Sequence, residues 1–397
     1  MVTAELPQLP FPRQDILDVG PLYRTLQAQA PLLPVRTPAG DVAWLVTRHA
    51  EARTLFADPR LGRSHPDPAR AARISAAALM GGPMGDVRTE AADHARMRRL
   101  LTPAFSAHRM NRLRSHVAEL VEQLIDRLAA GGRPADLHET LSFPLPVLVI
   151  CELLGVPYDD RERFRVWSQG CADLTDRAAS AAALDQLVGY MRELILRKRT
   201  APDEDVISDL IKAEDGRLPD GAVAELAAGL LFAGHETTVA RIDIGALLLM
   251  THPDQLDRLH HDPCLVAPAV EEILRLAAPS GLGLGLARYA HEDIDIADVR
   301  IRAGDAVLID SAITNRDPDA IPEPERFDIA RTPNPHLSFG HGAHYCIGAS
   351  LARVELQEVF TALPTRLPTL HLAVPVEQLR LRTDLLTGGL TALPVSW

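Results

Sequence analysis

The sequence predicts a mainly α-helical fold with small β-sheets, and three observations support this prediction. Of the 397 residues, 47% are hydrophobic, which is enough for a large core. Apolar side chains recur at helical spacing along most of the chain, and the longest such stretch runs from 219 to 250. Short alternating segments are confined to three places, near residue 40, between 283 and 314, and at the C-terminus. No linker-like or repetitive tract divides the chain, so we expect a single domain over residues 1–397.

The elements follow in chain order. Alternation at 33–36 and 42–47, separated by Pro38-Ala-Gly40, predicts a β-hairpin. Helical periodicity predicts helices over 48–57, 92–100, 107–130, 160–174, 181–199, 219–250, 267–276 and 349–363. Within the β-rich segment, strands are expected at 294–296, 299–301 and 306–310. The stretch 379–395 alternates again around a turn at Gly388-Gly389, and residues 80–86 form a loop rich in glycine.

Charge and cysteine content exclude several classes of protein. The net charge of −12 disfavours nucleic acid or an anionic membrane as the main partner. Four widely spaced cysteines without a C-x-x-C pair are typical of a reduced, cytoplasmic protein. Since the sequence has neither a signal segment nor an uncharged apolar run of membrane-spanning length, we expect no membrane partner and a monomer in the cytoplasm.

The most informative motif surrounds Cys346, in the stretch Phe339-Gly-His-Gly-Ala-His-Tyr-Cys-Ile-Gly348. The cysteine lies between glycines and just before a helical pattern, where a helix N-terminus favours a thiolate. The glycines let the backbone approach a flat ligand closely. A purely structural cysteine would need no such glycines, and a zinc site with His341 and His344 would lack the usual paired spacing. The loop therefore favours a thiolate ligand for a haem iron.

A second motif, Ala233-Gly-His-Glu-Thr-Thr238, lies in the middle of the longest apolar helix. Polar groups at that place are costly unless they are hydrogen-bonded or functional. Local bonds from Thr237 and Thr238 to preceding carbonyls would satisfy both hydroxyls without any function. That explanation does not account for the two small residues Ala233 and Gly234.

Two further motifs are weak when taken alone. Glu272 and Arg275 are three residues apart, a spacing that usually gives an exposed helix salt bridge of little value. Similarly, His94 and Arg98 share one helix face, which is most often simply a solvated basic face.

These motifs occur in the order found in the cytochrome P450 family, and the loop around Cys346 resembles the cysteine loop of that family almost letter for letter. The resemblance covers essentially the whole chain and implies the cytochrome P450 fold. It further implies a haem b cofactor whose iron has Cys346 as its axial ligand. Within the family, the segment Glu236–Gly245 indicates an actinobacterial type that tailors antibiotics.

The resemblance also assigns roles to the other motif residues. Glu236 and Thr237, with Thr238 beside them, correspond to the acid–alcohol group that delivers protons while the O–O bond is cleaved. Ala233 and Gly234 correspond to the small residues that leave room for dioxygen. The family binds the haem propionates through residues that match His94, Arg98, Arg288 and His344. Phe339 and Gly348 complete the cofactor site, Phe339 by packing on its thiolate side. Arg326 corresponds to the third member of a buried network with Glu272 and Arg275.

By the same resemblance, the chain is expected to be a monooxygenase that hydroxylates or epoxidises a bulky apolar secondary metabolite. A macrolide or other polyketide is the first candidate for the substrate, and a terpenoid lactone is the second. The chain lacks a flavin or dinucleotide fingerprint, so electrons are expected from a ferredoxin and its NAD(P)H-dependent reductase. We expect that ferredoxin to dock at Arg99, Arg331 and Arg353. The substrate pocket is expected to be lined by residues 80–92, 165–180, 230–236, 281–287 and 385–390. A non-catalytic haem sensor and a peroxygenase are the alternatives, and Glu236 with Thr237 argues against both.

Overall fold

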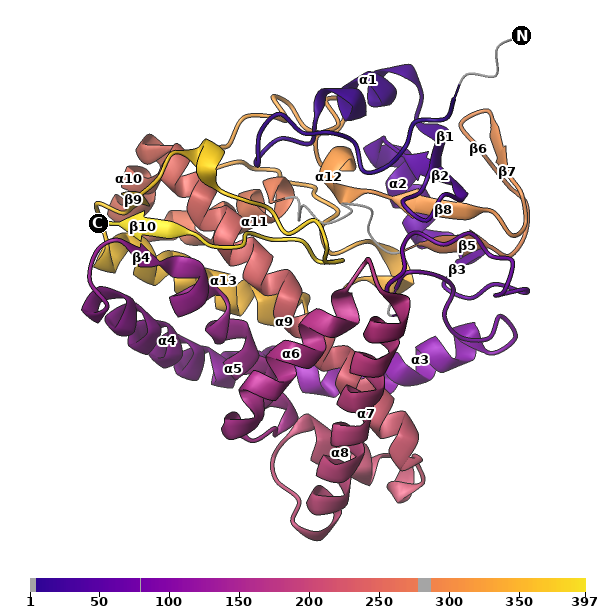
Figure 1. Ribbon diagram of the computed structural model, residues 1–397, viewed down its shortest axis with the longest axis horizontal. Helices are drawn as coiled ribbons and strands as arrows, with labels where there is room; N and C mark the ends of the chain where they lie inside the picture. The colour runs from indigo at the N-terminus through magenta and orange to yellow at the C-terminus, as the bar shows by residue number, and fades with distance from the viewer. Residues whose placement is uncertain (1–4, 79, 278–286) are drawn as a thin grey trace.

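The structure is a computed structural model that describes residues 5–78, 80–277 and 287–397. Figure 1 shows a helical body with the larger sheet at one side of it and the smaller sheets at the periphery. The α-helices of the described residues are α1 (Pro21–Gln29), α2 (His49–Ala57), α3 (Glu90–Leu101), α4 (Ala107–Ala130), α5 (Pro144–Leu154), α6 (Arg161–Ala172), α7 (Arg177–Thr200), α8 (Val206–Lys212), α9 (Asp220–Thr251), α10 (Pro253–His261), α11 (Val266–Leu276), α12 (Ser311–Thr314) and α13 (Ala349–Arg366).

The strands of the described residues form three small sheets. The strands are β1 (Leu32–Arg36), β2 (Val42–Val46), β3 (Leu61–Gly62), β4 (Ala135–Asp136), β5 (Arg288–Ala290), β6 (Ile294–Ile296), β7 (Val299–Ile301), β8 (Ala306–Ile309), β9 (His371–Leu372) and β10 (Pro394–Ser396). The largest sheet has the order β1-β2-β8-β5-β3, in which only the β2–β8 pair is parallel. The other sheets are β4-β10-β9 and the β6–β7 hairpin. The fold class predicted from the sequence is therefore confirmed.

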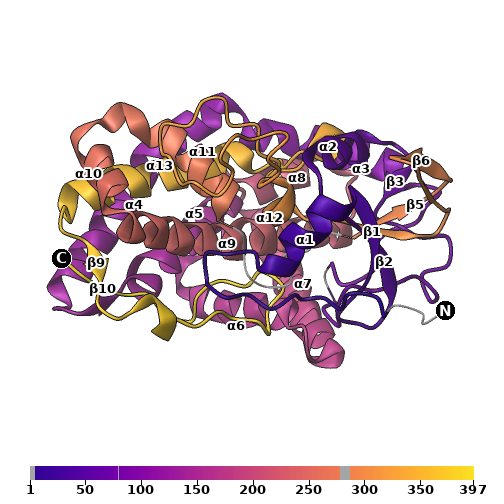
Figure 2. The same ribbon diagram turned by 90° about the horizontal axis from the view of Figure 1, so that it is seen from above.

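Helix α9 is the central element of the helical body (Figures 1 and 2). It contacts α5 and α7 on one side and α11 and α13 on the other. Most of its side chains are buried in the main hydrophobic core. At 1.5 Å per residue, its 32 residues extend about 48 Å, which is long enough to cross the whole helical body. The sequence predicted this helix to within one residue at each end.

Five α-helices of the described residues were not predicted from the sequence, namely α1, α5, α8, α10 and the four-residue α12. Helix α5 is apolar on every side and nearly all of it is buried, so it lacks the one-sided periodicity that marks an amphipathic helix. Helix α8 has only 7 residues. Helix α10 begins at Pro253 directly after α9, so the two helices look like one pattern with a break.

The C-terminal stretch differs from the alternation expected over 379–395. Only β10 is a strand there, and the rest is a loop that returns on itself through the Leu381–Leu390 bridge. The predicted turn is present, since Gly388 and Gly389 both have positive φ (64° and 100°). A hydrogen bond holds this loop against the end of α6, since the Leu386 N–H donates to the Ala172 carbonyl at 2.8 Å.

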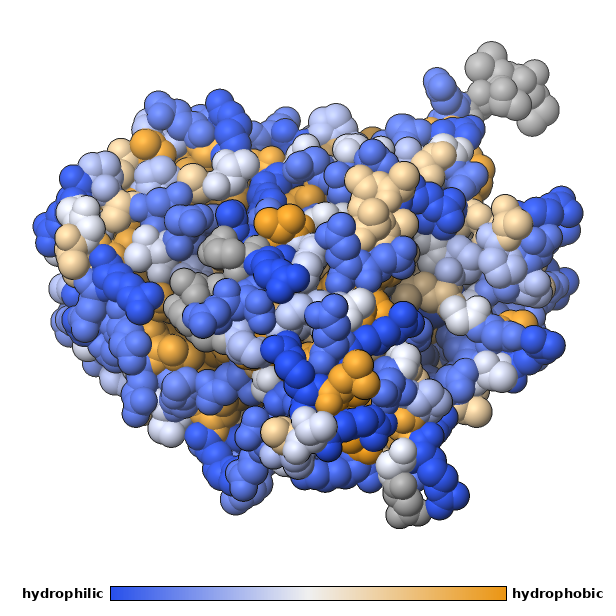
Figure 3. Space-filling view, turned by 60° about the horizontal axis from the view of Figure 1, so that its bottom comes forward, coloured by the Kyte–Doolittle hydropathy of each residue, from blue (hydrophilic) through white to orange (hydrophobic). Residues whose placement is uncertain are grey.

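The surface seen in Figure 3 is mostly hydrophilic, with hydrophobic side chains in small separate patches. Among the helices in the described part of the chain, none combines the length and the apolar character that crossing a membrane requires.

Candidate active site

The Cys346 loop is a tight turn that leads directly into α13. The Cys346 N–H donates to the carbonyl of Phe339 at 2.9 Å and so closes the loop. Gly342 has φ +72°, and a Cβ at this position would come within 2.9 Å of Ala57 Cα in α2. The loop therefore needs a glycine at 342 both for its backbone conformation and for its close approach to α2.

Cys346 is accessible at its surface and yet enclosed by protein. Enclosure raises the pKa of its thiol, while the N–H groups of Gly348 and Ala349 and the charges of Arg98 and Arg353 lower it. The start of α13 therefore lowers the pKa of the Cys346 thiol, as the sequence indicated, but burial raises this pKa by more. The cysteines in α5 and α6, Cys151 and Cys171, are buried thiols whose pKa rises to about 12 through burial. Such thiols are inert, whereas Cys346 can reach a ligand.

The geometry of the loop gives no support to the zinc alternative. In the part of the chain that the structure describes, no three His, Cys, Asp or Glu side chains are grouped so that they could hold a metal ion. A zinc site needs three or four such ligands. A single accessible thiol instead suits a cofactor that brings its own remaining ligands, as haem does.

On α9, Ala233 and Thr237 are exposed although the helix is central and its other faces are buried. They are four residues apart and so lie on one face, which borders an internal space. The Thr237 hydroxyl donates to the Ala233 carbonyl at 2.9 Å, and Thr238, which is buried, donates to the Gly234 carbonyl at 3.3 Å. Both back-bonds considered from the sequence are therefore formed, but only Thr237 also faces the open space.

Gly234 does not lie on this open face. A Cβ at Gly234 would come within 3.0 Å of the Ile150 side chain in α5. The small residue at 234 therefore serves the packing of α9 against α5, and of the two small residues only Ala233 borders the internal space.

Glu236 points toward the C-terminal loop instead of toward Thr237. It is 3% exposed, and its Oε2 accepts a long hydrogen bond of 3.4 Å from the hydroxyl of Thr387. Its Oε1 has no hydrogen-bond partner among the described residues and lies 3.8 Å from Nδ1 of His235. A carboxylate with one free buried oxygen is suited to exchange protons through water.

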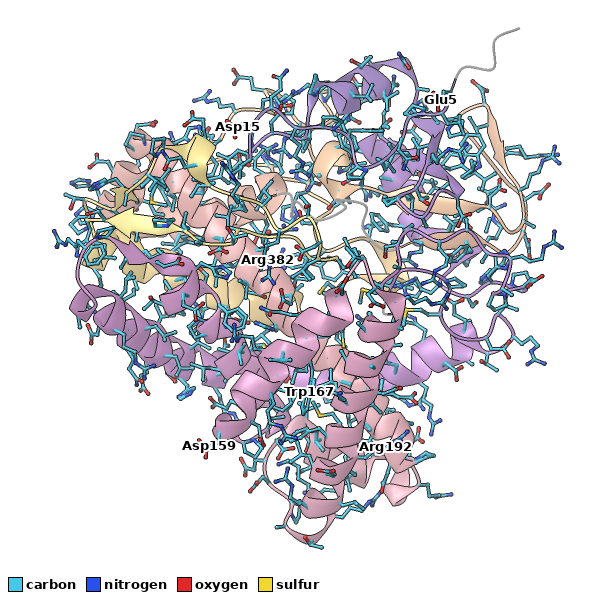
Figure 4. All side chains as sticks on the ribbon, viewed as in Figure 1. Glu5, Asp15, Asp159, Trp167, Arg192 and Arg382 are labelled. Atoms are coloured by element: carbon cyan, nitrogen blue, oxygen red, sulfur yellow. The ribbon has the colours of Figure 1, made fainter. Side chains whose placement is uncertain are left out.

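Further ionisable groups surround this carboxylate. His138 and Asp243 form a buried pair at 2.7 Å, in which hydrogen bonding to Asp243 raises the pKa of His138 against the effect of burial. Arg382, labelled near the middle of the molecule in Figure 4, is close enough to lower the pKa of His235, although burial is the larger cause. Sequence reasoning missed these neighbours of Glu236, because they come from segments far apart in the chain.

A cluster of basic side chains, two histidines and several arginines, lies beside the cysteine loop. The rings of His94 (α3) and His344 stack at 3.9 Å between centroids, and neither ring makes a hydrogen bond to a described residue. Burial, followed by the charge of Arg288, lowers the pKa of His344 to about 4. Arg288 itself is 7% exposed, and its guanidinium has no hydrogen bond or ion pair among the described residues. The structure brings together the three residues His94, His344 and Arg288 that the resemblance assigned to the haem propionates.

Arg98 and Arg63 complete this cluster. Arg98 donates to the Tyr345 carbonyl at 2.8 Å and so ties α3 to the residue before the cysteine. Arg63, which sequence reasoning missed, is enclosed beside Arg288. Burial and then Arg288 lower its pKa to about 10, and its Nε has no partner among the described residues. Because Arg63 lies in an irregular loop, no periodic pattern could have marked it.

Behind the site, Glu272 is held by Arg275 at 2.8 Å and by Arg331 at 3.1 Å. The assignment of Arg326 to this network is wrong: its side chain is 59% exposed and pairs with Glu323, and only its carbonyl accepts from the two arginines. Arg331 is only 11% exposed, so it is also wrong as a docking residue for a ferredoxin.

The remaining segments expected around a substrate converge on one side of α9. The Ala78 N–H donates to Ser180 Oγ at 3.0 Å, and Leu174 N–H donates to the Asp384 carbonyl at 2.9 Å. The loop before α3, the junction of α6 and α7, and the C-terminal loop are thus joined. The expected lining by residues 281–286 lies outside the described residues.

Haem fits this arrangement. Its iron would find the accessible thiol of Cys346, and its two propionates would find the unpaired donors of Arg288, Arg63 and the two stacked histidines. Buried cations without partners are costly in the empty protein, and carboxylates are the groups that arginine binds best.

The family model described as Cytochrome P450 matches residues 264–368. The chain is 46% identical to pentalenolactone synthase of Streptomyces exfoliatus, over 99% of this chain and 100% of that protein. It is 40% identical to mycinamicin IV hydroxylase/epoxidase of Micromonospora griseorubida, over the full length of both. Among solved structures, substrate-free PimD, a polyene macrolide antibiotic pimaricin epoxidase, matches with a TM-score of 0.89 and 46% identity over 99% of both chains.

The likeness to pentalenolactone synthase and to the pimaricin epoxidase confirms the type within the family that the sequence indicated. Identity of this extent over the whole chain shows common family membership, and with it the haem-thiolate cofactor and the monooxygenase activity. The chain belongs to the cytochrome P450 family.

Proposed function

We propose that this monooxygenase hydroxylates or epoxidises a bulky apolar secondary metabolite, with a macrolide or other polyketide as the first substrate class. The names of the relatives support this class, since they include a mycinamicin hydroxylase/epoxidase and a pimaricin epoxidase. A lactone of terpenoid type is the second candidate, and the likeness to pentalenolactone synthase favours it. The site contributes an accessible face of the otherwise buried helix α9, on which Ala233 and Thr237 are exposed.

The single observation that carries the proposal is the accessible thiol of Cys346 in its closed loop. Haem bound there supplies the activation of dioxygen and the insertion of one oxygen atom into the substrate. The N–H groups of Gly348 and Ala349 stabilise the thiolate that binds the iron. Phe339 packs beside this loop under the guanidinium of Arg353, whose Cζ lies 4.6 Å from the ring centroid.

The proton delivery that we propose uses Thr237 and Glu236. Thr237 holds a proton at its Oγ on the open face of α9, and it can turn that proton from the Ala233 carbonyl toward a ligand. Glu236 accepts protons at its free Oε1 and exchanges them with water, while Thr387 orients its other oxygen. Thr238 remains bonded inside the helix and has no direct part.

Electrons come from separate proteins in this proposal, namely a ferredoxin and its NAD(P)H-dependent reductase. Arg99 in α3 is 67% exposed and Tyr345, next to Cys346, is 38% exposed, so both can meet an acidic ferredoxin. Arg353 contributes less than the sequence suggested, because its guanidinium is bonded to Glu271 at 2.6 Å.

The test of the cofactor site compares two cysteine variants. Cys346→Ser should lose the thiolate-type CO difference spectrum and all turnover, because serine cannot supply the thiolate. Cys264→Ser changes an exposed surface thiol and should keep both. Turnover should require ferredoxin, reductase and NADPH, and hydrogen peroxide alone should not replace them. A Cys346→Ser protein with an unchanged CO spectrum would show that another residue binds the iron.

A further inference from the structure

Arg241 is a charged side chain on the open face of α9, one turn beyond Thr237. It is partly accessible at its surface and yet enclosed by protein, which is the pattern seen at Cys346. Its Nη1 donates to the carbonyl of Ala277, the residue that follows α11. This is the only hydrogen bond that its side chain makes within the described residues, although a guanidinium has five N–H donors. Most of its hydrogen-bonding capacity is therefore unused.

Among the described residues, no acidic side chain compensates the charge of Arg241. Burial lowers the pKa of Arg241 to about 10, and no carboxylate acts against this effect. The chain that follows Ala277 cannot supply one either, since residues 278–286 contain no Asp or Glu. Its charge is therefore balanced only by the carbonyl end of α11.

The other enclosed arginines differ from Arg241 in this respect. Arg275 is bonded to Glu272. Arg316 is paired with Glu325, and Arg63 and Arg288 both feel the charge of Glu90. Arg241 thus differs from these arginines in having no described carboxylate near its charge. An unpaired buried cation costs free energy of folding that a leucine at the same position would not cost. A purely structural contact between α9 and α11 therefore does not explain why this residue is an arginine.

We propose that Arg241 binds a carboxylate of the substrate, so that the substrate is a bulky apolar carboxylic acid. This inference rests on the proposed function and narrows its substrate class. Four residues of helix separate Arg241 from Thr237, which is about 6 Å along α9. The carboxylate would therefore anchor the substrate close to the place where Thr237 holds its proton, and a guanidinium can grip both carboxylate oxygens.

The experiment uses the haem-loaded enzyme and pairs of ligands that differ only in charge. Abietic acid and lithocholic acid, each against its methyl ester, are titrated into the protein while the spin-state shift of the haem is followed. Calorimetry of the same titrations gives a second readout. The variants are Arg241→Gln, Arg241→Lys and, as a control on an exposed arginine of the β6–β7 hairpin, Arg300→Gln.

We expect the unmodified protein to bind at least one of the acids tenfold or more tightly than its ester. Arg241→Gln should remove this preference while leaving the affinity for the ester within about twofold, Arg241→Lys should keep part of it, and Arg300→Gln should keep all of it. If no acid is preferred over its ester, or if Arg241→Gln keeps the preference, the proposal is overturned. A lower melting temperature of Arg241→Gln with an unchanged preference would identify Arg241 as a tie between α9 and α11.

The CO difference spectrum of each protein is recorded first. A spectrum without the thiolate signature in the unmodified protein would contradict the proposed function itself. A normal spectrum without any preference for acids contradicts only the inference about Arg241.

Discussion

Thr237 and Thr238 are neighbours in the sequence but have different surroundings on α9. Thr237 is exposed to the internal space, whereas Thr238 is 4% exposed and bonded to the Gly234 carbonyl. Their hydroxyls are chemically identical, so the pair offers a matched comparison. If position decides the function, only the accessible hydroxyl delivers protons.

We predict that Thr237→Ala still binds haem and substrate and still consumes NADPH, but that less product forms for each NADPH. The reason is that the open face of α9 then lacks a proton donor, so electrons are lost to peroxide. Thr238→Ala should keep the ratio of product to NADPH near that of the unmodified protein. Loss of coupling in Thr238→Ala alone would contradict the assignment, and unchanged coupling in the double variant would contradict any relay through these threonines.

At this scale, the sequence predicted residues whose local pattern is distinctive. Cys346 was identifiable from the glycines around it, and Thr237 from two polar groups in an apolar helix. Arg63, Arg241 and Thr387 were not identifiable, because their importance comes from burial without a partner or from a contact across 151 residues of chain. Only the folded chain shows which charges are left unpaired.

At the scale of elements, the buried network behind the haem shows how a motif can be placed correctly and one of its members wrongly. Glu272 and Arg275 lie three residues apart on α11, so helix geometry fixes their contact. The third arginine comes from an irregular segment, where spacing does not determine which side chain turns inward. The structure chooses Arg331, and Arg326 contributes only its backbone carbonyl.

This difference gives a paired prediction on stability. Arg331→Met should lower the free energy of unfolding by about 1.5–3 kcal/mol, because it removes a charged hydrogen bond to a fully buried carboxylate. Arg326→Met should change it by no more than about 0.5 kcal/mol, because its side chain is exposed. Urea unfolding of both haem-loaded variants checks the prediction. Equal losses in the two variants would show that the inward turn of Arg331 does not stabilise the protein.

Helices with one apolar face, such as α4, were predicted to the residue, whereas α5 was missed because it is apolar throughout. Periodicity reports the contrast between a buried and an exposed face, and a fully buried helix has no such contrast. Three strands of the largest sheet, β1, β2 and β8, were predicted from the sequence, whereas the short strands β3 and β5 were not. The pairing of β2 with β8 and of β3 with β5, each across more than 220 residues, could not be derived from local pattern.

For the whole molecule, the site is an arrangement of charges brought together from distant segments. Arg63 comes from the loop after β3, His94 from α3, Arg288 from β5 and His344 from the cysteine loop. In the protein without haem these groups face one another, and the charge of Arg288 lowers the pKa of both Arg63 and His344 in addition to the larger effect of burial. The fold therefore holds two neighbouring arginine charges, which Glu90 offsets in part and which the two propionates of a bound haem would offset further.

We therefore predict opposite effects of one substitution on the two forms of the protein. In the haem-loaded form, Arg288→Met should speed the transfer of haem to apomyoglobin by about 10-fold to 100-fold, because a charged hydrogen bond of about 1.5–3 kcal/mol is lost. In the haem-free form, the same substitution should raise the urea midpoint of unfolding, because an unpaired buried cation is replaced by an apolar side chain of similar length.

Arg300→Met, in the exposed β6–β7 hairpin, is the control and should change neither quantity appreciably. If Arg288→Met weakened both forms to the same extent, Arg288 would be an ordinary structural group of the sheet, held by contacts that do not depend on haem. Weaker haem retention together with higher stability of the haem-free form would identify Arg288 as a residue that serves to bind the cofactor. Such a residue reduces the stability of the empty chain, and its interaction with the cofactor restores that stability when haem binds.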